Sequence, residues 1–221
     1  MINWWIGCSG FYYKHWKEVF YPKGLPQKKW FEFYCEHFNT VELNNTFYRF
    51  PQLSFLQSWY DRSPELFRFA VKAPRQITHF NQFHHSEQLI SDFYGTVREG
   101  LTDKLGCVLF QLPPRIDYTD ERLHRILDSL DSGFRNVLEF RHPSWWNTEV
   151  YQALARRSVT FCGQSHPKLP TTVVQNIPTL YYRFHGVPAL YQSLYSEQEL
   201  KDFLQEVAGA KNTQEAWVYF N

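Results

Sequence analysis

Short segments of alternating hydrophobic and polar residues recur along the chain, and most are followed by a segment with helical periodicity. The pattern is clearest in VLEFRHPSWW, residues 137–146, where Val137, Glu139 and Arg141 share one face and the apolar residues between them share the other. A period of two is typical of a β-strand. The same pattern predicts further strands at residues 4–7, 40–50, 67–75, 106–114, 158–165, 179–186 and 216–221.

Apolar residues spaced three or four positions apart predict the helices between these strands. Helices are expected at residues 28–38, after Pro51, at 86–99, from Thr119, at 148–154 and after Ser196, which opens the capping-box sequence SEQE. Residues 166–178 contain three prolines and no helical period. We therefore expect at most a single helical turn between the sixth and seventh strands.

This alternation of strands and helices is typical of the α/β class and predicts a parallel (β/α)8 barrel of the TIM-barrel type. The barrel should be irregular around its sixth strand and should lack the last helix, since the eighth predicted strand runs to Asn221. No linker or repeat divides the chain, so we expect one domain over residues 1–221. In such barrels the functional residues lie at the C-terminal ends of the strands.

The formal net charge of the chain is +1, which disfavours extensive contact with a nucleic-acid backbone or an anionic membrane. No apolar run reaches the roughly 20 residues that span a bilayer. The opening sequence MINWWIGCSG has neither a basic region nor a long apolar region. We expect a cytoplasmic protein that does not contact a membrane, and any anion site should be local.

Cysteines and aromatic residues are expected to serve mainly in the core. The four cysteines, Cys8, Cys35, Cys107 and Cys162, lie far apart and form no CxxC pair, so we interpret them as small buried hydrophobic residues. Aromatic residues make up 19% of the chain. Most should pack between barrel and helices, and some should line a pocket that stacks on rings.

Two glutamates are candidates for catalysis. Glu42 and Glu139 are predicted to face inward from strands two and five, nearly opposite each other in an eight-stranded barrel. They could act as acid and base with His142 or His185 as a proton partner, or share a divalent cation with one of these histidines. The chain has no tight metal motif such as HExxH, so no metal or other cofactor is assigned.

An alternative is that the glutamates have only a structural role, because cationic side chains nearby could neutralise them. Lys72 lies on the strand next to Glu42, and Arg141 or Arg183 could pair with Glu139. Together with Arg75 these residues are predicted to point at one mouth, where guanidinium groups bind phosphate or carboxylate. We therefore expect a small anionic ligand. The ligand-binding residues assigned from the sequence are Lys72, Arg75, Arg141, Arg183, Gln111, Tyr195, Asn221 and Ser9.

Eight sequence segments together resemble the YecE-like family, also called domain of unknown function 72. They are IGCSGFYYKHW, FYPKGLP, HFNTVELNNTFYRFP, FRFAVKAPRQITH, GCVLFQLPP, VLEFRHPSWW, YYRFHG with YSEQEL, and VYFN. The resemblance spans essentially the whole chain and implies a TIM-barrel-like fold without implying a reaction. Ser165 stands where the family pattern leads us to expect an aspartate, and the chain ends at VYFN where the pattern continues. A weaker, fold-level similarity links it to barrels of the endonuclease IV type.

Three functions are compatible with these residues. The first is an enzyme that acts on a sugar phosphate or nucleotide by acid/base chemistry, for example as a hydrolase or isomerase. The second is a nucleic-acid-binding protein, in which aromatic residues stack on bases. The third is a ligand-binding barrel without catalysis, which the expected lack of a last helix makes more plausible. We favour the first, and the sequence indicates neither a substrate nor an oligomeric state.

Overall fold

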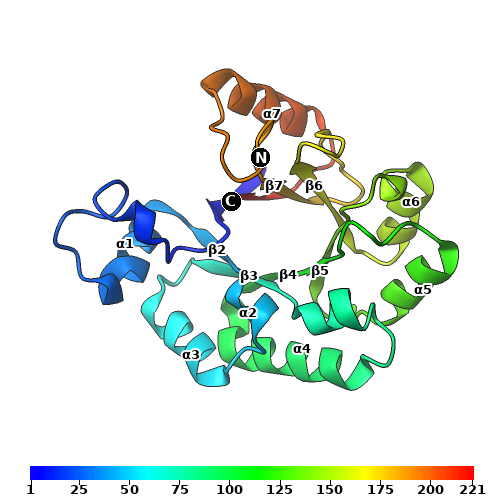
Figure 1. Ribbon diagram of the computed structural model, residues 1–221, viewed down its shortest axis with the longest axis horizontal. Coiled ribbons are helices and arrows are strands. Elements are labelled where there is room, and N and C mark those ends of the chain that lie inside the picture. Colours follow the sequence, from blue (N-terminus) through cyan, green and yellow to red (C-terminus); the bar gives the residue numbers. More distant parts are fainter.

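The computed structural model describes residues 1–221 and contains one eight-stranded parallel sheet with the strand order β1-β8-β7-β6-β5-β4-β3-β2. The sheet curves into a nearly closed barrel with helices around it (Figure 1), which confirms the predicted fold class. The strands are β1 (Asn3–Cys8), β2 (Thr40–Leu43), β3 (Arg68–Lys72), β4 (Leu105–Gln111), β5 (Arg135–Glu139), β6 (Thr160–Ser165), β7 (Thr179–Phe184) and β8 (Glu215–Phe220).

Helices connect every pair of consecutive strands except β6 and β7, as the proline-rich segment predicts. The α-helices are α1 (Trp30–His37), α2 (Asn45–Tyr48), α3 (Leu53–Arg62), α4 (Glu87–Leu101), α5 (Asp120–Asp128), α6 (Thr148–Arg156) and α7 (Glu197–Gly209). Short 3-10 or π turns occupy Lys14–Trp16, Gln27–Lys29, Gln76–Phe80, Thr102–Lys104 and Pro143–Trp145. Ser196 forms the predicted capping box of α7. No helix combines the length and the apolar character that crossing a bilayer requires.

The alternation within each strand separates two hydrophobic regions. Side chains such as Leu109, Val137 and Tyr181 fill the inside of the barrel, whereas Phe69, Phe110 and Leu138 pack outward against the helices. Cys8, Cys107 and Cys162 are buried, as predicted, whereas Cys35 is half-buried, and all four thiols are free. The apolar interior leaves room for inward-pointing polar side chains at the C-terminal ends of the strands.

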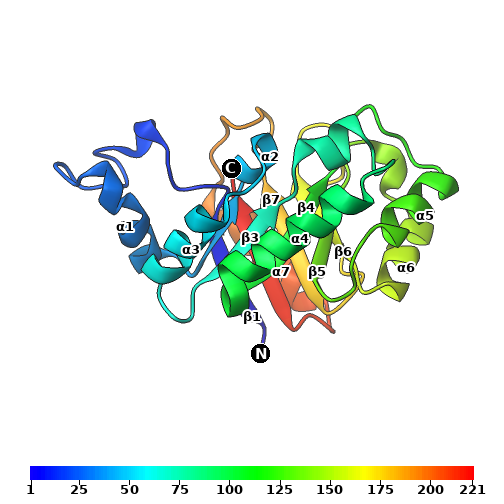
Figure 2. The ribbon, with the colours of Figure 1, turned by 90° about the horizontal axis from the view of Figure 1, so that it is seen from below.

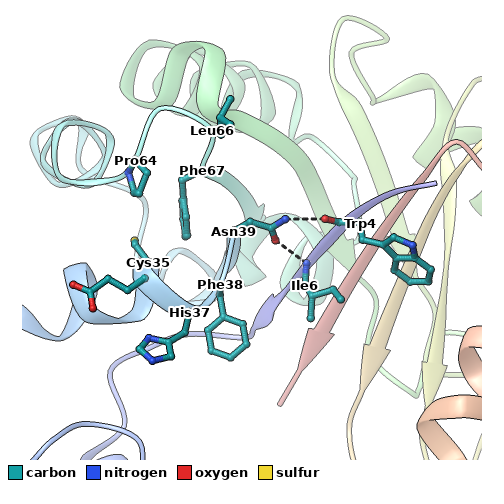
Figure 3. Close-up of a pocket in the computed structure, with 10 residues that line it drawn as sticks. Trp4, Ile6, Cys35, His37, Phe38, Asn39, Pro64, Leu66 and Phe67 are labelled. Carbon is teal, nitrogen blue, oxygen red and sulfur yellow. Dashed lines mark hydrogen bonds between the residues drawn. The ribbon is translucent and has the colours of Figure 1, made fainter. Parts of the chain in front are cut away.

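The barrel closes between β1 and β2 through side chains, because no backbone ladder joins these two strands. The Asn39 carboxamide donates to Trp4 O at 2.7 Å and accepts from Ile6 N at 2.9 Å, as Figure 3 shows. The Tyr34 hydroxyl accepts from Cys8 N at 2.7 Å and donates to Thr40 O at 2.9 Å. Two side chains thus satisfy the strand edges that a sheet ladder would otherwise pair.

This seam leaves no room for a side chain at Gly7. A Cβ atom at this position would lie 2.1 Å from Thr40 O and 2.8 Å from the Tyr34 hydroxyl. Both atoms belong to the closure, so neither can move away without breaking a hydrogen bond. Gly7 is therefore required by the close approach of β1 and β2, rather than by a turn.

We predict that Gly7→Ala destabilises the protein by about 1–3 kcal/mol, because the added methyl group overpacks the seam. Gly95→Ala is the matched control, since Gly95 lies within α4 with no atom within 4 Å of its added Cβ. The control should stabilise by about 0.5–1 kcal/mol through its better helix propensity. Urea unfolding of both variants measures the difference, and equal effects would show that the seam tolerates a side chain.

Candidate functional site at the mouth of the barrel

A polar layer caps the apolar interior at the C-terminal ends of the strands. The chain enters the barrel at the lower end in Figure 2, and the C-terminus and α2 lie at the opposite end, where this layer is found. Its members alternate with outward-facing apolar residues, so the period-two pattern positions them. The buried side chains of the layer are Ser9, Glu42, Lys72, Gln111, Glu139, Gln164, Arg183 and His185.

Arg183 on β7 joins the two glutamates. Its Nη2 donates to Glu42 Oε1 at 2.6 Å and its Nη1 donates to Glu139 Oε2 at 2.5 Å. The arginine side chain is 2% exposed and both glutamates are fully buried. Burial alone would favour the neutral forms, but the mutual attraction of these charges keeps all three groups ionised.

Glu42 has further donors on every side. Ser9 Oγ and Asn44 Nδ2 donate to its Oε1 at 2.8 and 3.0 Å, and the Tyr181 hydroxyl donates to Oε2 at 2.6 Å. Burial raises the pKa of Glu42, yet the charge of Arg183 and these hydrogen bonds lower it overall. The ion-pair partner of this carboxylate is therefore Arg183, and Lys72 attracts it only from beyond direct contact.

Glu139 on β5 is held by two arginines. Arg141 Nε pairs with Oε1, and Arg183 pairs with Oε2. Both arginines that the sequence offered as partners of Glu139 therefore pair with it. Burial raises its pKa, but the charges of Arg141 and Arg183 hold it well below the usual range. A carboxylate with so low a pKa is a weak base, and Arg183 already lies between the two glutamates where a shared divalent cation was considered.

His185 is fully buried beside this network and stays neutral. Arg141 Nη2 lies 2.8 Å from its Nε2, and the Asn221 carboxamide contacts its Nδ1. Because a guanidinium only donates, Nε2 accepts this hydrogen bond. Burial and the charge of Arg183 lower the pKa of His185 to about 3. The ring therefore accepts from Arg141 and does not carry charge near neutral pH.

Lys72 at the end of β3 is the one cation of the layer without a carboxylate partner. Its Nζ donates to Gln111 Oε1 at 2.9 Å and lies 4.1 Å from the centre of the Phe47 ring. The residue is 8% exposed. Burial and repulsion by Arg183 lower the pKa of Lys72 to about 8. The ammonium group thus contacts a neutral amide and an aromatic face, and Glu139 and Glu42 attract it only from beyond direct contact.

A cavity of about 600 Å³ lies above the layer. Polar and aromatic side chains form its wall, a composition that suits a small ligand with both ring and polar groups. The residues that line it are Cys8, Ser9, Tyr13, His15, Trp16, Asn44, Phe47, Tyr48, Lys72, Gln111, Arg141, Arg183, Tyr191, Phe220 and Asn221. A second cavity, of about 550 Å³, lies beside the β1–β2 seam around Asn39 and lacks such a charged layer (Figure 3).

Most of the residues assigned from the sequence meet at this mouth. Six of the predicted ligand-binding residues line the cavity, and three predicted catalytic residues lie in or beside the layer that supports it. The six are Ser9, Lys72, Gln111, Arg141, Arg183 and Asn221, and the three are Glu42, Glu139 and His185. Their functional roles stay predictions, whereas their convergence is a feature of the structure.

Three assigned residues lie elsewhere. His142 is half-buried outside the cavity, where its Nδ1 contacts Ser144 Oγ at 2.8 Å and its ring caps the Pro143–Trp145 turn. Arg75 is exposed, with its guanidinium 5.7 Å from the Tyr48 ring centre. The Tyr195 hydroxyl accepts from Gly186 N at 2.6 Å and contacts Ser165 Oγ, so it fastens a loop. None of these three lines the cavity.

Several residues of the site were missed, among them Asn44, Tyr13 and Phe47. Asn44 contacts Glu42 directly, and its phase with Thr40 and Glu42 along the chain was the available signal. Tyr13 lines the cavity and donates to Ser9 O at 2.6 Å, but it comes from the loop after β1, where no periodicity predicts direction. No group of three or more His, Cys, Asp or Glu side chains in residues 1–221 is arranged to hold a metal ion.

The family description "Protein of unknown function DUF72" matches residues 5–221 of the chain. The chain belongs to this family. The match confirms the resemblance seen in the sequence motifs, and it covers every strand of the barrel except the first residues of β1. The DUF72 description names no reaction, so chemistry has to be argued from the mouth of the barrel.

Relatives of this DUF72 chain are known from sequence and structure. UPF0759 protein YecE of Escherichia coli K12 is 33% identical over 134 residues, covering 56% of this chain and 49% of that protein. UPF0759 protein YunF of Bacillus subtilis 168 is 31% identical over 141 residues, covering 61% and 50%. The matched segments thus span about half the length of these relatives.

Solved structures of the family share the fold. A DUF72 family protein from Thermotoga maritima MSB8 superposes with a TM-score of 0.88 at 27% identity, covering 99% of this chain and 92% of that one. A DUF72 family protein from Enterococcus faecalis V583 gives a TM-score of 0.76 at 21% identity, covering 100% and 91%. The second similarity concerns the fold alone.

We predict that Arg183→Met costs about 3–5 kcal/mol of stability at pH 7, because it leaves the buried Glu42 without its ion-pair partner and Glu139 with Arg141 alone. In the wild type the lowered pKa values of Glu42 and Glu139 contribute stability above their unfolded pKa that is lost as the pH falls through the folded values. In the variant these groups bind protons instead. The deficit should therefore shrink between pH 7 and pH 5, as urea unfolding at each pH measures.

Arg157→Met is the control for this prediction, because Arg157 pairs with Asp128 on the surface and both side chains are more than half exposed. Its loss should cost less than about 1 kcal/mol at either pH. An Arg183→Met deficit as small as that of Arg157→Met, or one that does not change with pH, would contradict the role given to the buried network.

Proposed function

We propose that this DUF72 protein binds a small anionic ligand, such as a phosphorylated or carboxylated sugar-like compound, at the mouth of the barrel. The charge balance of the polar layer carries the proposal. Arg183 and Arg141 compensate Glu42 and Glu139, and His185 is neutral, which leaves the charge of Lys72 in excess. A buried, uncompensated cation at the floor of a cavity favours an anion.

The cavity wall supports a ligand of modest size. Lys72 and Arg141 lie in the wall with Asn44, Gln111 and Asn221, which offer hydrogen-bonding groups for hydroxyl or phosphate oxygens. Arg141 uses Nε and Nη2 within the layer, and its Nη1 forms no hydrogen bond inside the protein. A ligand oxygen at this position would gain a charge-assisted hydrogen bond. Aromatic rings such as Phe47 and Tyr48 provide faces for a sugar or base.

The two glutamates are assigned a supporting role in this proposal. Glu42 and Glu139 have lowered pKa values, and each of their oxygens already accepts from a protein donor. They orient the arginines and do not exchange protons. Acid/base catalysis by these two carboxylates is therefore less favoured than ligand binding. An enzymatic reaction at this site would need a different catalytic group.

Binding of nucleic acid is less favoured than binding of a small anion. The formal net charge is only +1, and the excess cation lies inside a cavity of about 600 Å³ rather than along an exposed stripe. An oligonucleotide would show a steep loss of affinity with salt, because many counterions are released. A small anion held mainly by Lys72 would show a shallow one.

We predict that sulfate, whose charge is constant across neutral pH, binds at the mouth and that its affinity falls above about pH 8. The lowered pKa of Lys72 means that the ammonium charge is lost in this range, so the dissociation constant should rise up to about tenfold for each further pH unit. Titration of the protein with sodium sulfate at constant ionic strength, followed by amide chemical shifts, measures both site and affinity.

Three variants make this test specific. Lys72→Met should abolish the binding, and Lys72→Arg should retain it but lose its pH dependence above pH 8, because a guanidinium stays charged. Lys23→Met, at an exposed loop position, is the control and should bind sulfate like the wild type. Shifts that are absent from the mouth, or that persist in Lys72→Met, would overturn the proposal.

A further inference from the structure

The two buried lysines of the chain differ sharply in their surroundings. Lys104 Nζ donates to Tyr60 O, Ser63 O and Ser63 Oγ at 2.8, 2.9 and 3.0 Å, so each of its three ammonium hydrogens has an oxygen acceptor. Lys72 Nζ has one oxygen acceptor, from Gln111. Lys104 is thus held as a structural cation, whereas the amine of Lys72 loses little on releasing a proton.

The position of Lys72 also gives a small molecule access to it. It lies in the wall of the cavity of about 600 Å³, at the end of β3, while Lys104 ends the turn directly before β4 and lines neither of the two cavities described above. The face of Phe47 fixes one side of the amine at 4.1 Å. The amine is therefore buried, oriented and open to the cavity, which are the conditions for a nucleophilic lysine.

We propose that Lys72 forms an imine with the carbonyl group of an anionic ligand, such as a 2-oxo acid or an open-chain sugar phosphate. This inference rests on the proposed function, since the same site binds the anion. It adds a covalent step and narrows the ligand class to compounds that contain both an aldehyde or ketone and an acidic group.

The step balances without an oxidant or a further co-reactant. The lone pair of the neutral amine forms a bond to the carbonyl carbon, and the carbonyl π electrons move to oxygen. A proton passes from nitrogen to that oxygen to give a carbinolamine. The C–O bond then breaks, the hydroxyl group leaves with a proton as water, and a C=N bond remains. Protonation of this nitrogen from solvent restores the positive charge that the uncharged amine lacked.

The protonated imine suits the charge balance of the layer. It keeps one positive charge at the position of Lys72, so the anionic group of the ligand still finds a counter-charge there and a donor at Arg141 Nη1. The lowered pKa of Lys72, about 8, leaves a fraction of the amine neutral near physiological pH, and burial is the main cause. An exposed lysine has a far smaller neutral fraction.

Reductive trapping tests the inference. The folded protein is incubated with pyruvate and sodium cyanoborohydride at pH 7.5, and the modified lysines are located by peptide mass mapping. Lys72 should be labelled at least about tenfold faster than the exposed lysines, given its lower pKa. Lys104 should stay unlabelled, and sulfate should slow labelling at Lys72 alone.

Lys72→Arg separates the two proposals, because it keeps the charge and removes the primary amine. It should bind sulfate and give no adduct in the cavity. Sulfate binding with labelling spread evenly over exposed lysines would overturn the imine and leave the anion site standing. Selective labelling of Lys72 without sulfate binding would support the imine and overturn the anion site. Neither binding nor selective labelling would overturn both.

Discussion

The ion pairs of Arg183 with Glu42 and Glu139 are the constraint on which the mouth of the barrel depends. Two carboxylates are buried without contact to solvent, and this is tolerable only because one guanidinium reaches both. Arg141 and Ser9 complete the network, and His185 is kept neutral beside it. The charges of the two glutamates below the cavity are therefore already balanced by the two arginines.

Lys72 is the one cation of this polar layer that has no carboxylate in direct contact. Because the glutamates are committed to the arginines, the lysine on β3 has a neutral amide and a ring as its neighbours. Burial lowers the pKa of Lys72. The excess positive charge of the layer lies on its Nζ atom, in the wall of the cavity. The proposed recognition of an anion and the proposed reactivity of the amine thus both rest on the absence of a carboxylate in contact with Lys72.

The sequence predicted the barrel and the inward direction of Glu42, Glu139 and Arg183, because strand periodicity is a local property. It could not predict which cation pairs with Glu42, since the choice depends on side-chain reach across the interior and not on strand adjacency. Beyond the strand ends, the sequence could not show that His142 and Tyr195 do not line the cavity. Their directions are set by a proline turn and by a returning loop, and neither has a period to interpret.

The seam between β1 and β2 has a consequence for how the chain is assembled. The only ladder partner of β1 is β8, which lies about as far from it in sequence as two strands can be. During synthesis β1 therefore emerges before β8 and lacks its ladder partner until β8 has been made. Asn39 and Tyr34 follow β1 closely in the chain, so their side chains can form hydrogen bonds with the backbone of β1 before β8 is made.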